Sequence, residues 1–244
     1  MKKLLTLLLV IAPFFTFAQS TSGVVMYEEK INLHKRMTID NPDIMAMIPE
    51  FKTDNKILVF NPKASIYRTP TKADKEQVTT KKTDEGEVRM VFKGNENSLY
   101  RNLSGGSSVE LKNFMGRKFL IEGELTKTKW KITGKQKKIG EYLCMQAMLD
   151  DTTQTEAWFT PQITVSTGPD TYGDLPGLIL EIHVGDDERV ITATDIKLEE
   201  MSDDAITPPT EGKKVTREKF KKIVEEKMEE MKSTGGGNFM IIRD

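Results

Sequence analysis

The stretch LILEIHVGDDERVITATDIK, residues 178–197, indicates the fold class of this chain. Apolar and polar residues alternate over Leu178–Val184 and again over Arg189–Lys197, with the acidic run Asp186–Glu188 between them. Alternation with a period of two is typical of β-strands that bury one face, and Gly and Asp favour turns. The stretch therefore predicts two antiparallel strands joined by a turn.

The same alternation, bounded by Gly, Pro, Asn or Asp, recurs from residue 24 to residue 198. It predicts further strands at Val24–Leu33, Ile57–Asn61, Val88–Lys93, Ser98–Leu103, Val109–Leu111, Lys118–Glu124, Trp130–Thr133, Glu141–Leu149 and Thr155–Val165. So many short strands predict a mainly β protein built as a large curved sheet, a half-barrel or a sandwich. We expect residues 19–244 to form one domain.

One helix is well signalled near the end of the chain. Thr216 is a favourable N-cap, and Val215 and Phe220 occupy the two positions of a hydrophobic staple. An apolar stripe follows, made of Phe220, Ile223, Val224, Met228 and Met231. The pattern predicts an amphipathic helix over about 216–232 that packs on the sheet. Helical spacing of apolar residues also predicts a short helix within Asn41–Lys52.

Residues 1–18 have the features of a cleavable secretory signal. Lys2 and Lys3 precede an apolar run from Leu4 to Phe15, and small residues stand at Thr16 and Ala18. We expect cleavage after Ala18 and no transmembrane segment in the remainder, because no later stretch approaches about 20 apolar residues. The mature protein is therefore expected in the periplasm, with surface display or secretion left open.

Charge and cysteine content narrow the function classes. Lys and Arg number 36 and Asp and Glu number 37, so the chain lacks the basic excess that nucleic-acid binding requires. The single cysteine, Cys144, lies among apolar neighbours, which predicts a buried thiol and excludes an intramolecular disulfide. No cofactor motif occurs, and the 13 methionines are better explained as core residues than as a copper site.

The segment Gly168–Gly177 concentrates residues with special backbone preferences. Pro176-Gly177 suits the centre of a type II turn, which would leave Leu175 at an exposed tip. Tyr172 and Asp174 could join it at a ligand or partner site, or the apolar side chains could instead plug the end of the sheet. The candidate binding residues are thus Tyr172, Asp174, Leu175, Pro176 and Gly177.

Catalytic groups are scarce. His34 and His183 are the two histidines, and no serine lies in a G-x-S-x-G setting. A Cys144/His183 nucleophile pair is the remaining enzymatic alternative. We expect no catalytic residues and no metal ligands.

From Trp130 onward, the sequence resembles the GLPGLI family of exported envelope proteins. The residues that carry the resemblance are Trp130, Gly140, Tyr142, Cys144, the run Ala157–Ile163, Gly168-Pro169, Tyr172-Gly173 and DLPGLI at 174–179. Asp174 replaces the first glycine of the family motif, and Asp tolerates a positive φ better than most residues. The resemblance implies export in bacteria rich in TonB-dependent receptors, without an established activity.

These observations favour a periplasmic, non-enzymatic binding or accessory protein. Its expected partner is an outer-membrane TonB-dependent receptor or a hydrophobic ligand, as in the half-barrels of periplasmic lipoprotein carriers, which the strand series resembles more weakly. The alternatives are an envelope enzyme that uses Cys144 and His183 and a methionine-based metal-handling protein.

Overall fold

The computed structural model describes residues 21–36, 45–46, 48–70 and 97–233. The expected signal at 1–18 and the predicted strand Val88–Lys93 lie outside these residues. Within the described part, no helix has the length and apolarity needed to cross a membrane.

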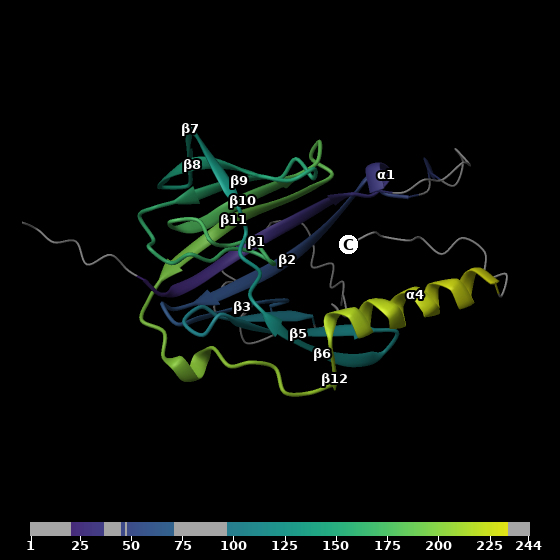
Figure 1. Ribbon diagram of the computed structural model, residues 1–244. Coiled ribbons are helices and arrows are strands. Elements are labelled where there is room, and N and C mark those ends of the chain that lie inside the picture. Colours follow the sequence, from purple (N-terminus) through teal and green to yellow (C-terminus); the bar gives the residue numbers. More distant parts are fainter. Residues whose placement is uncertain (1–20, 37–44, 47, 71–96, 234–244) are drawn as a thin grey trace, which may run out of the picture.

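The described chain is dominated by a single sheet of twelve strands (Figure 1). The strands are β1 (Gly23–Asn32), β2 (Phe51–Phe60), β3 (Ala64–Arg68), β4 (Ser98–Asn102), β5 (Ser107–Phe114), β6 (Arg117–Glu124), β7 (Trp130–Ile139), β8 (Tyr142–Leu149), β9 (Glu156–Thr160), β10 (Leu178–Val184), β11 (Arg189–Leu198) and β12 (Lys213–Val215). Their spatial order is β12-β6-β5-β4-β3-β2-β1-β11-β10-β9-β8-β7. Neighbours pair antiparallel except β12 and β6, which pair parallel.

The mainly β prediction is confirmed, with local corrections. Alternation did not reveal β3 and β12, which have five and three residues. The helix predicted at Asn41–Lys52 is wrong at its end, because Phe51 and Lys52 begin β2 and pair with β1, and its residues 41–44 and 47 lie outside the described residues. Cross-strand pairing over ten residues there overrides the local helical spacing.

The C-terminal helix α4 (Arg217–Ser233) packs against β6, as predicted. The backbone N–H of Lys219 donates to Thr216 Oγ1 at 3.2 Å, so Thr216 is the N-cap. Phe220 makes edge-on ring contacts with Phe114 and Phe119, at centroid distances of 6.2 and 5.3 Å. These contacts fix the start of α4 against β6, beside which the helix lies in Figure 1.

We call the face of β1 that carries Val25, Tyr27 and Glu29 the inner face. Around β8–β11 and β1 it is covered by the connection between β9 and β10, whose Ile163, Val165 and Leu175 join the main core. A buried hydrogen bond from Tyr27 Oη to the carbonyl of Ile179, at 2.6 Å, ties β1 to β10. The rest of the inner face, toward β5, is not filled in this way.

Candidate functional site

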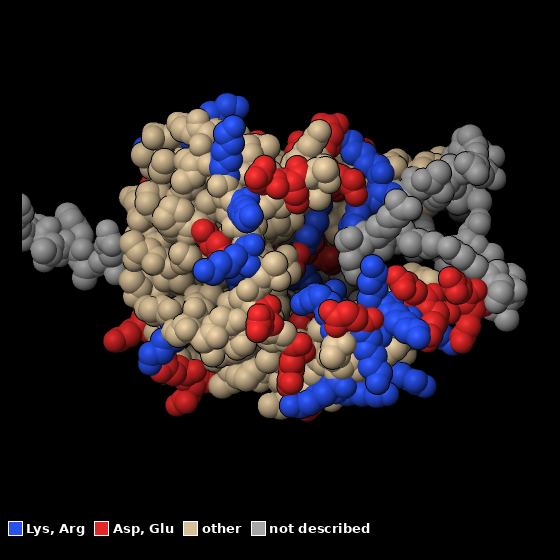
Figure 2. Space-filling view, viewed as in Figure 1, with Lys and Arg blue, Asp and Glu red and all other residues tan. Residues whose placement is uncertain are grey.

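A cavity of about 710 Å³ lies on the unfilled part of the inner face. Its floor comes from β1 to β5 and one wall from residues 170–172, and Arg36, Arg189 and the first residue of α4, Arg217, also line it. In Figure 2, acidic and basic side chains gather around the hollow at the centre of the face, whereas the surface beside it is mostly uncharged. The cavity is therefore a polar one.

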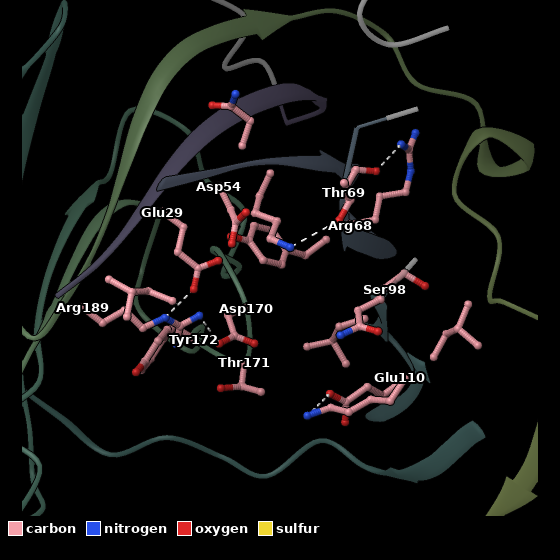
Figure 3. Close-up of a pocket in the computed structure, with 18 of the residues that line it drawn as sticks. Glu29, Asp54, Arg68, Thr69, Ser98, Glu110, Asp170, Thr171, Tyr172 and Arg189 are labelled. Atoms are coloured by element: carbon pink, nitrogen blue, oxygen red, sulfur yellow. Dashed lines mark hydrogen bonds and ion pairs between the residues drawn. The ribbon is translucent and has the colours of Figure 1, made fainter. Parts of the chain in front are cut away.

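Arg189 binds two carboxylates at one end of the cavity (Figure 3). Its Nε donates to Glu29 Oε1 at 2.6 Å, and its Nη2 donates to Asp170 Oδ2 at 2.8 Å. Partial burial lowers the pKa of Arg189, but Asp170 and Glu29 more than offset this and hold it above its ordinary value. The guanidinium joins β11, β1 and the loop after β9 through charge-assisted hydrogen bonds.

Tyr67 contributes an unpartnered hydroxyl to the same cavity. Its side chain is on the floor, the residue is 7% exposed, and its Oη has no hydrogen-bond partner among the described residues. Burial, and after it the charges of Glu29 and Asp170, raise the pKa of Tyr67 well above 10, so the hydroxyl keeps its proton. A buried donor left unpaired destabilises a fold by about 1–3 kcal/mol, which marks this group as a candidate ligand contact.

The other carboxylates of the lining are also ion-paired. Asp54 contacts Lys52 at 2.7 Å, and Glu110 contacts Lys112 at 3.3 Å and Arg217 at 3.4 Å. Lys56 instead donates to Thr69 Oγ1 at 3.2 Å and has no carboxylate partner in the described part of the chain. The cavity thus holds ammonium and guanidinium groups in excess of its carboxylates.

The wall at residues 170–172 is held by a buried arginine. Arg101 is 3% exposed and donates from Nη1 to the carbonyl of Tyr172 at 2.6 Å. A Cβ on Gly173 would lie 2.5 Å from the Arg101 nitrogens, so glycine leaves room for the guanidinium. On the other side, Trp130 Nε1 donates to the carbonyl of Gly173 at 2.8 Å, which fixes the Tyr172 ring beside the cavity.

The structure separates the five candidate residues of this loop. Tyr172 lines the cavity, whereas Asp174 is exposed and accepts from the backbone N–H of Thr128 at 2.9 Å. Of the two interpretations of Leu175, the exposed tip is wrong and the buried plug is right, because this side chain is 2% exposed and lies in the main core. Pro176 is exposed and Gly177 is buried, and neither lines the cavity.

The turn at Pro176-Gly177 is not type II. The N–H of Gly177 donates to the carbonyl of Leu175 at 2.8 Å, and the N–H of Leu178 donates outside the turn, to Ile163 at 3.0 Å. Gly177 has φ 152°, and a Cβ there would lie 2.1 Å from the carbonyl oxygen of Thr160. Glycine is needed because β9 passes so close. Asp174 has φ 66°, the positive value expected from its place in the motif.

Comparison with known proteins gives a family model but no activity. Residues 147–181 match the model described as "Protein of unknown function (Porph_ging)". The match covers about a seventh of the chain, namely the last three residues of β8, all of β9, the following loop and the start of β10. It falls in the region on which the resemblance to GLPGLI proteins was based. No match was found among curated proteins.

The fold is similar to that of PNGF-II, which is solved in space groups C2 and P21. The TM-scores are 0.55 and 0.54 at 14% identity, over 84% of this chain. This chain spans about a third of the PNGF-II chains, 32% and 33%. At that identity the likeness concerns the fold alone.

Cys144 and His183 do not form a hydrogen-bonded pair. Cys144 is fully buried, as predicted, and its thiol contacts the carbonyl of Tyr142 at 3.7 Å. Burial raises the pKa of Cys144 to about 11, which disfavours the thiolate. His183 is hydrogen-bonded instead to Glu181 and, at 2.6 Å, to Asp187. The described residues contain no cluster of His, Cys, Asp and Glu suited to a metal ion.

His183 should make stability depend on pH. Its hydrogen bond to Glu181, opposed by partial burial and reinforced by Asp187, raises its pKa from 6.5 to about 9. The stabilisation is therefore complete below pH 6.5 and is lost as the pH rises through about 9. Between pH 6.5 and 9, we expect the free energy of unfolding to fall by about 1 kcal/mol more in wild type than in His183→Gln. The effect is no larger because solvent screens this half-buried group. Urea titrations at both pH values would measure this, and equal losses in the two proteins would refute it.

Sequence reasoning missed the residues on the cavity floor and the arginine that holds the wall, although a signal existed. Glu29 follows Val25 and Tyr27 at a spacing of two, and Arg101 follows Leu99 in the same way. Each places a charged residue on the buried face of a strand, where an unpaired charge is costly. Such residues indicate a buried ion pair or a binding site, whereas Tyr67 on the undetected β3 carried no comparable signal.

Proposed function

We propose that this protein is a non-enzymatic binding protein of the bacterial envelope, and that the cavity on the inner face is its ligand site. The observation that carries the proposal is the combination of a cavity of about 710 Å³ with the buried, unpartnered hydroxyl of Tyr67. Ligand sites in proteins commonly occupy 300–1,000 Å³ and contain a few placed polar groups. The expected signal peptide supports export to the periplasm, where an outer-membrane TonB-dependent receptor is a candidate partner.

The cavity favours a polar ligand over the hydrophobic one expected from the sequence. Its lining is rich in charged side chains, and the apolar part of the inner face is filled by Ile163, Val165 and Leu175 of the chain itself. An acyl chain in this cavity would displace water from charged groups without replacing their hydrogen bonds, which is unfavourable. We therefore revise the ligand class to polar molecules.

Blocking the cavity tests the proposal. Thr171 is exposed and lines the cavity, so Thr171→Trp should occupy ligand space without removing a buried contact. Ser166→Trp places the same ring on an exposed position of the same loop outside the lining and is the matched control. The probes are trigalacturonate, cellotriose, triglutamate and trialanine. Their binding is measured by calorimetry and by tryptophan fluorescence. Fluorescence is suitable because the Trp130 ring lies 6.3 Å from that of Tyr172, beside the cavity.

We expect at least one probe to bind wild type and Ser166→Trp saturably, and its affinity for Thr171→Trp to be at least about tenfold lower, a loss of about 1.4 kcal/mol. Absence of a saturable probe, or equal binding by Thr171→Trp, would overturn the cavity as the ligand site.

A further inference from the structure

We infer that the ligand of the cavity is an acidic sugar, a hydroxyl-rich molecule that carries at least one carboxylate. This inference rests on the proposed function and names the chemistry of its ligand. It is drawn from the hydrogen-bonding groups that the cavity leaves uncommitted, from the structure of its floor and from the aromatic ring in its wall.

The charged side chains of the lining are mostly cationic. All four lining carboxylates, Glu29, Asp54, Glu110 and Asp170, contact a Lys or Arg of the lining within 3.4 Å. The lining holds seven Lys or Arg residues against these four carboxylates, and one of the seven, Arg36, contacts Glu188 outside the lining at 3.0 Å. A ligand that brings acceptors and negative charge is therefore complementary to the cavity, and one that brings a cation is not.

Two uncommitted donors lie at the same end of the cavity. The Tyr67 hydroxyl has no partner among the described residues, and its ring packs edge-on against Tyr27, two residues before Glu29 on β1. Arg189 uses Nε and Nη2 for the two carboxylates, and its Nη1 has no hydrogen-bond partner among the described residues. A carboxylate of the ligand can accept from both groups, and Lys56 supplies a further positive charge on the floor.

The floor favours a sugar over a peptide. It is the face of β1 to β5, whose backbone groups already pair with neighbouring strands. A peptide recognised by strand addition needs an unpaired sheet edge, which this floor does not offer. Sugar hydroxyls instead donate to carboxylates such as those of Glu110 and Asp54, and the half-buried Tyr172 ring offers an apolar surface for a sugar ring.

The experiment compares matched probes on the full mature chain. Trigalacturonate, its fully methyl-esterified form and triglutamate are titrated by calorimetry into wild type, Lys56→Gln, Tyr67→Phe and the control Lys138→Gln. Lys138 is exposed on β7, away from the cavity. Gln at 56 can keep the hydrogen bond to Thr69, and Phe at 67 removes only the hydroxyl.

We expect trigalacturonate to bind wild type at least tenfold more tightly than its methyl ester, and raised salt to reduce this preference. Lys56→Gln should reduce the affinity for trigalacturonate at least threefold and leave the affinity for the ester unchanged. Tyr67→Phe should reduce the affinity for trigalacturonate at least fivefold. It should not lower the midpoint of thermal unfolding, because it removes an unsatisfied buried group. Lys138→Gln should change neither affinity.

If wild type bound trigalacturonate and its methyl ester with equal affinity, and Thr171→Trp bound neither, the inference of an anionic ligand would be overturned. The cavity would remain the binding site. Tighter binding of triglutamate than of trigalacturonate would overturn the inference that the ligand is a sugar, and would support the inference that it is anionic. Binding that Thr171→Trp leaves intact would instead overturn the proposed function.

Discussion

Arg189→Met is expected to reduce the free energy of unfolding by about 3–5 kcal/mol, because it leaves two carboxylates without their counter-charge. Glu29 is 7% exposed and accepts from Arg189 Nε at 2.6 Å, and Asp170 accepts from Nη2 at 2.8 Å. A loss of that size is a large share of the 5–15 kcal/mol that stabilises a typical domain. Equilibrium unfolding in urea, followed by tryptophan fluorescence, would measure it.

Two further variants separate the ion pairs from a general effect of losing an arginine. Arg117→Met removes an exposed arginine at the start of β6 and should cost less than about 0.5 kcal/mol. The double variant Glu29→Gln/Arg189→Met should be more stable than Arg189→Met alone, since a buried amide is less costly than a buried unpaired carboxylate. A double variant less stable than Arg189→Met would contradict the assigned role of the pair.

Leu175→Asp is expected to prevent stable folding. Leu175 is 2% exposed within the main core, and Leu→Ala at such positions costs about 2–5 kcal/mol through lost burial and the remaining cavity. A carboxylate at this position adds desolvation without a partner. Far-UV and near-UV circular dichroism and urea titration would compare the stability of Leu175→Asp, Leu175→Ala and Leu175→Met. Leu175→Met conserves volume and should reduce the free energy of unfolding by less than about 1.5 kcal/mol.

The control is Pro176→Ala, one residue further along and exposed. It should stay within about 1 kcal/mol of wild type, because no buried side chain is truncated. If Leu175→Asp folded with native near-UV signals, Leu175 would have to be an exposed contact residue, which is one of the two interpretations that the sequence left open. If Leu175→Asp unfolds the whole domain, as expected, loss of binding to a partner protein in this variant would not show that Leu175 contacts the partner.

Local pattern predicted the secondary structure best where strands have one buried face. Leu178–Val184 was predicted to the residue, and Arg189–Leu198 to within one residue. Alternation failed for β3, whose Ala64, Ser65 and Tyr67 are all buried, so the strand has no exposed face to reveal its period. It failed also for β12, whose three residues are fewer than one alternation pattern needs.

The candidate site was predicted only at its wall. Tyr172 was selected because it lies in a Gly- and Pro-rich loop, and it does line the cavity. For Leu175 the sequence left an exposed tip and a buried plug open, because a tight turn in sequence says nothing about which side of the sheet the turn faces. Here the connection between β9 and β10 folds back over the inner face, so its apolar side chains are buried instead of exposed.

By itself, the sequence determined the mainly β class, the amphipathic α4 with Thr216 as its cap, and the buried state of Cys144, because each depends on residues close together in the chain. Only the tertiary structure decided the site. It brings Glu29, Tyr67, Asp170 and Arg189 to one end of a cavity, although they are up to 160 residues apart. Sheet order and the path of one loop set that convergence, and both depend on long-range packing that local alternation does not encode.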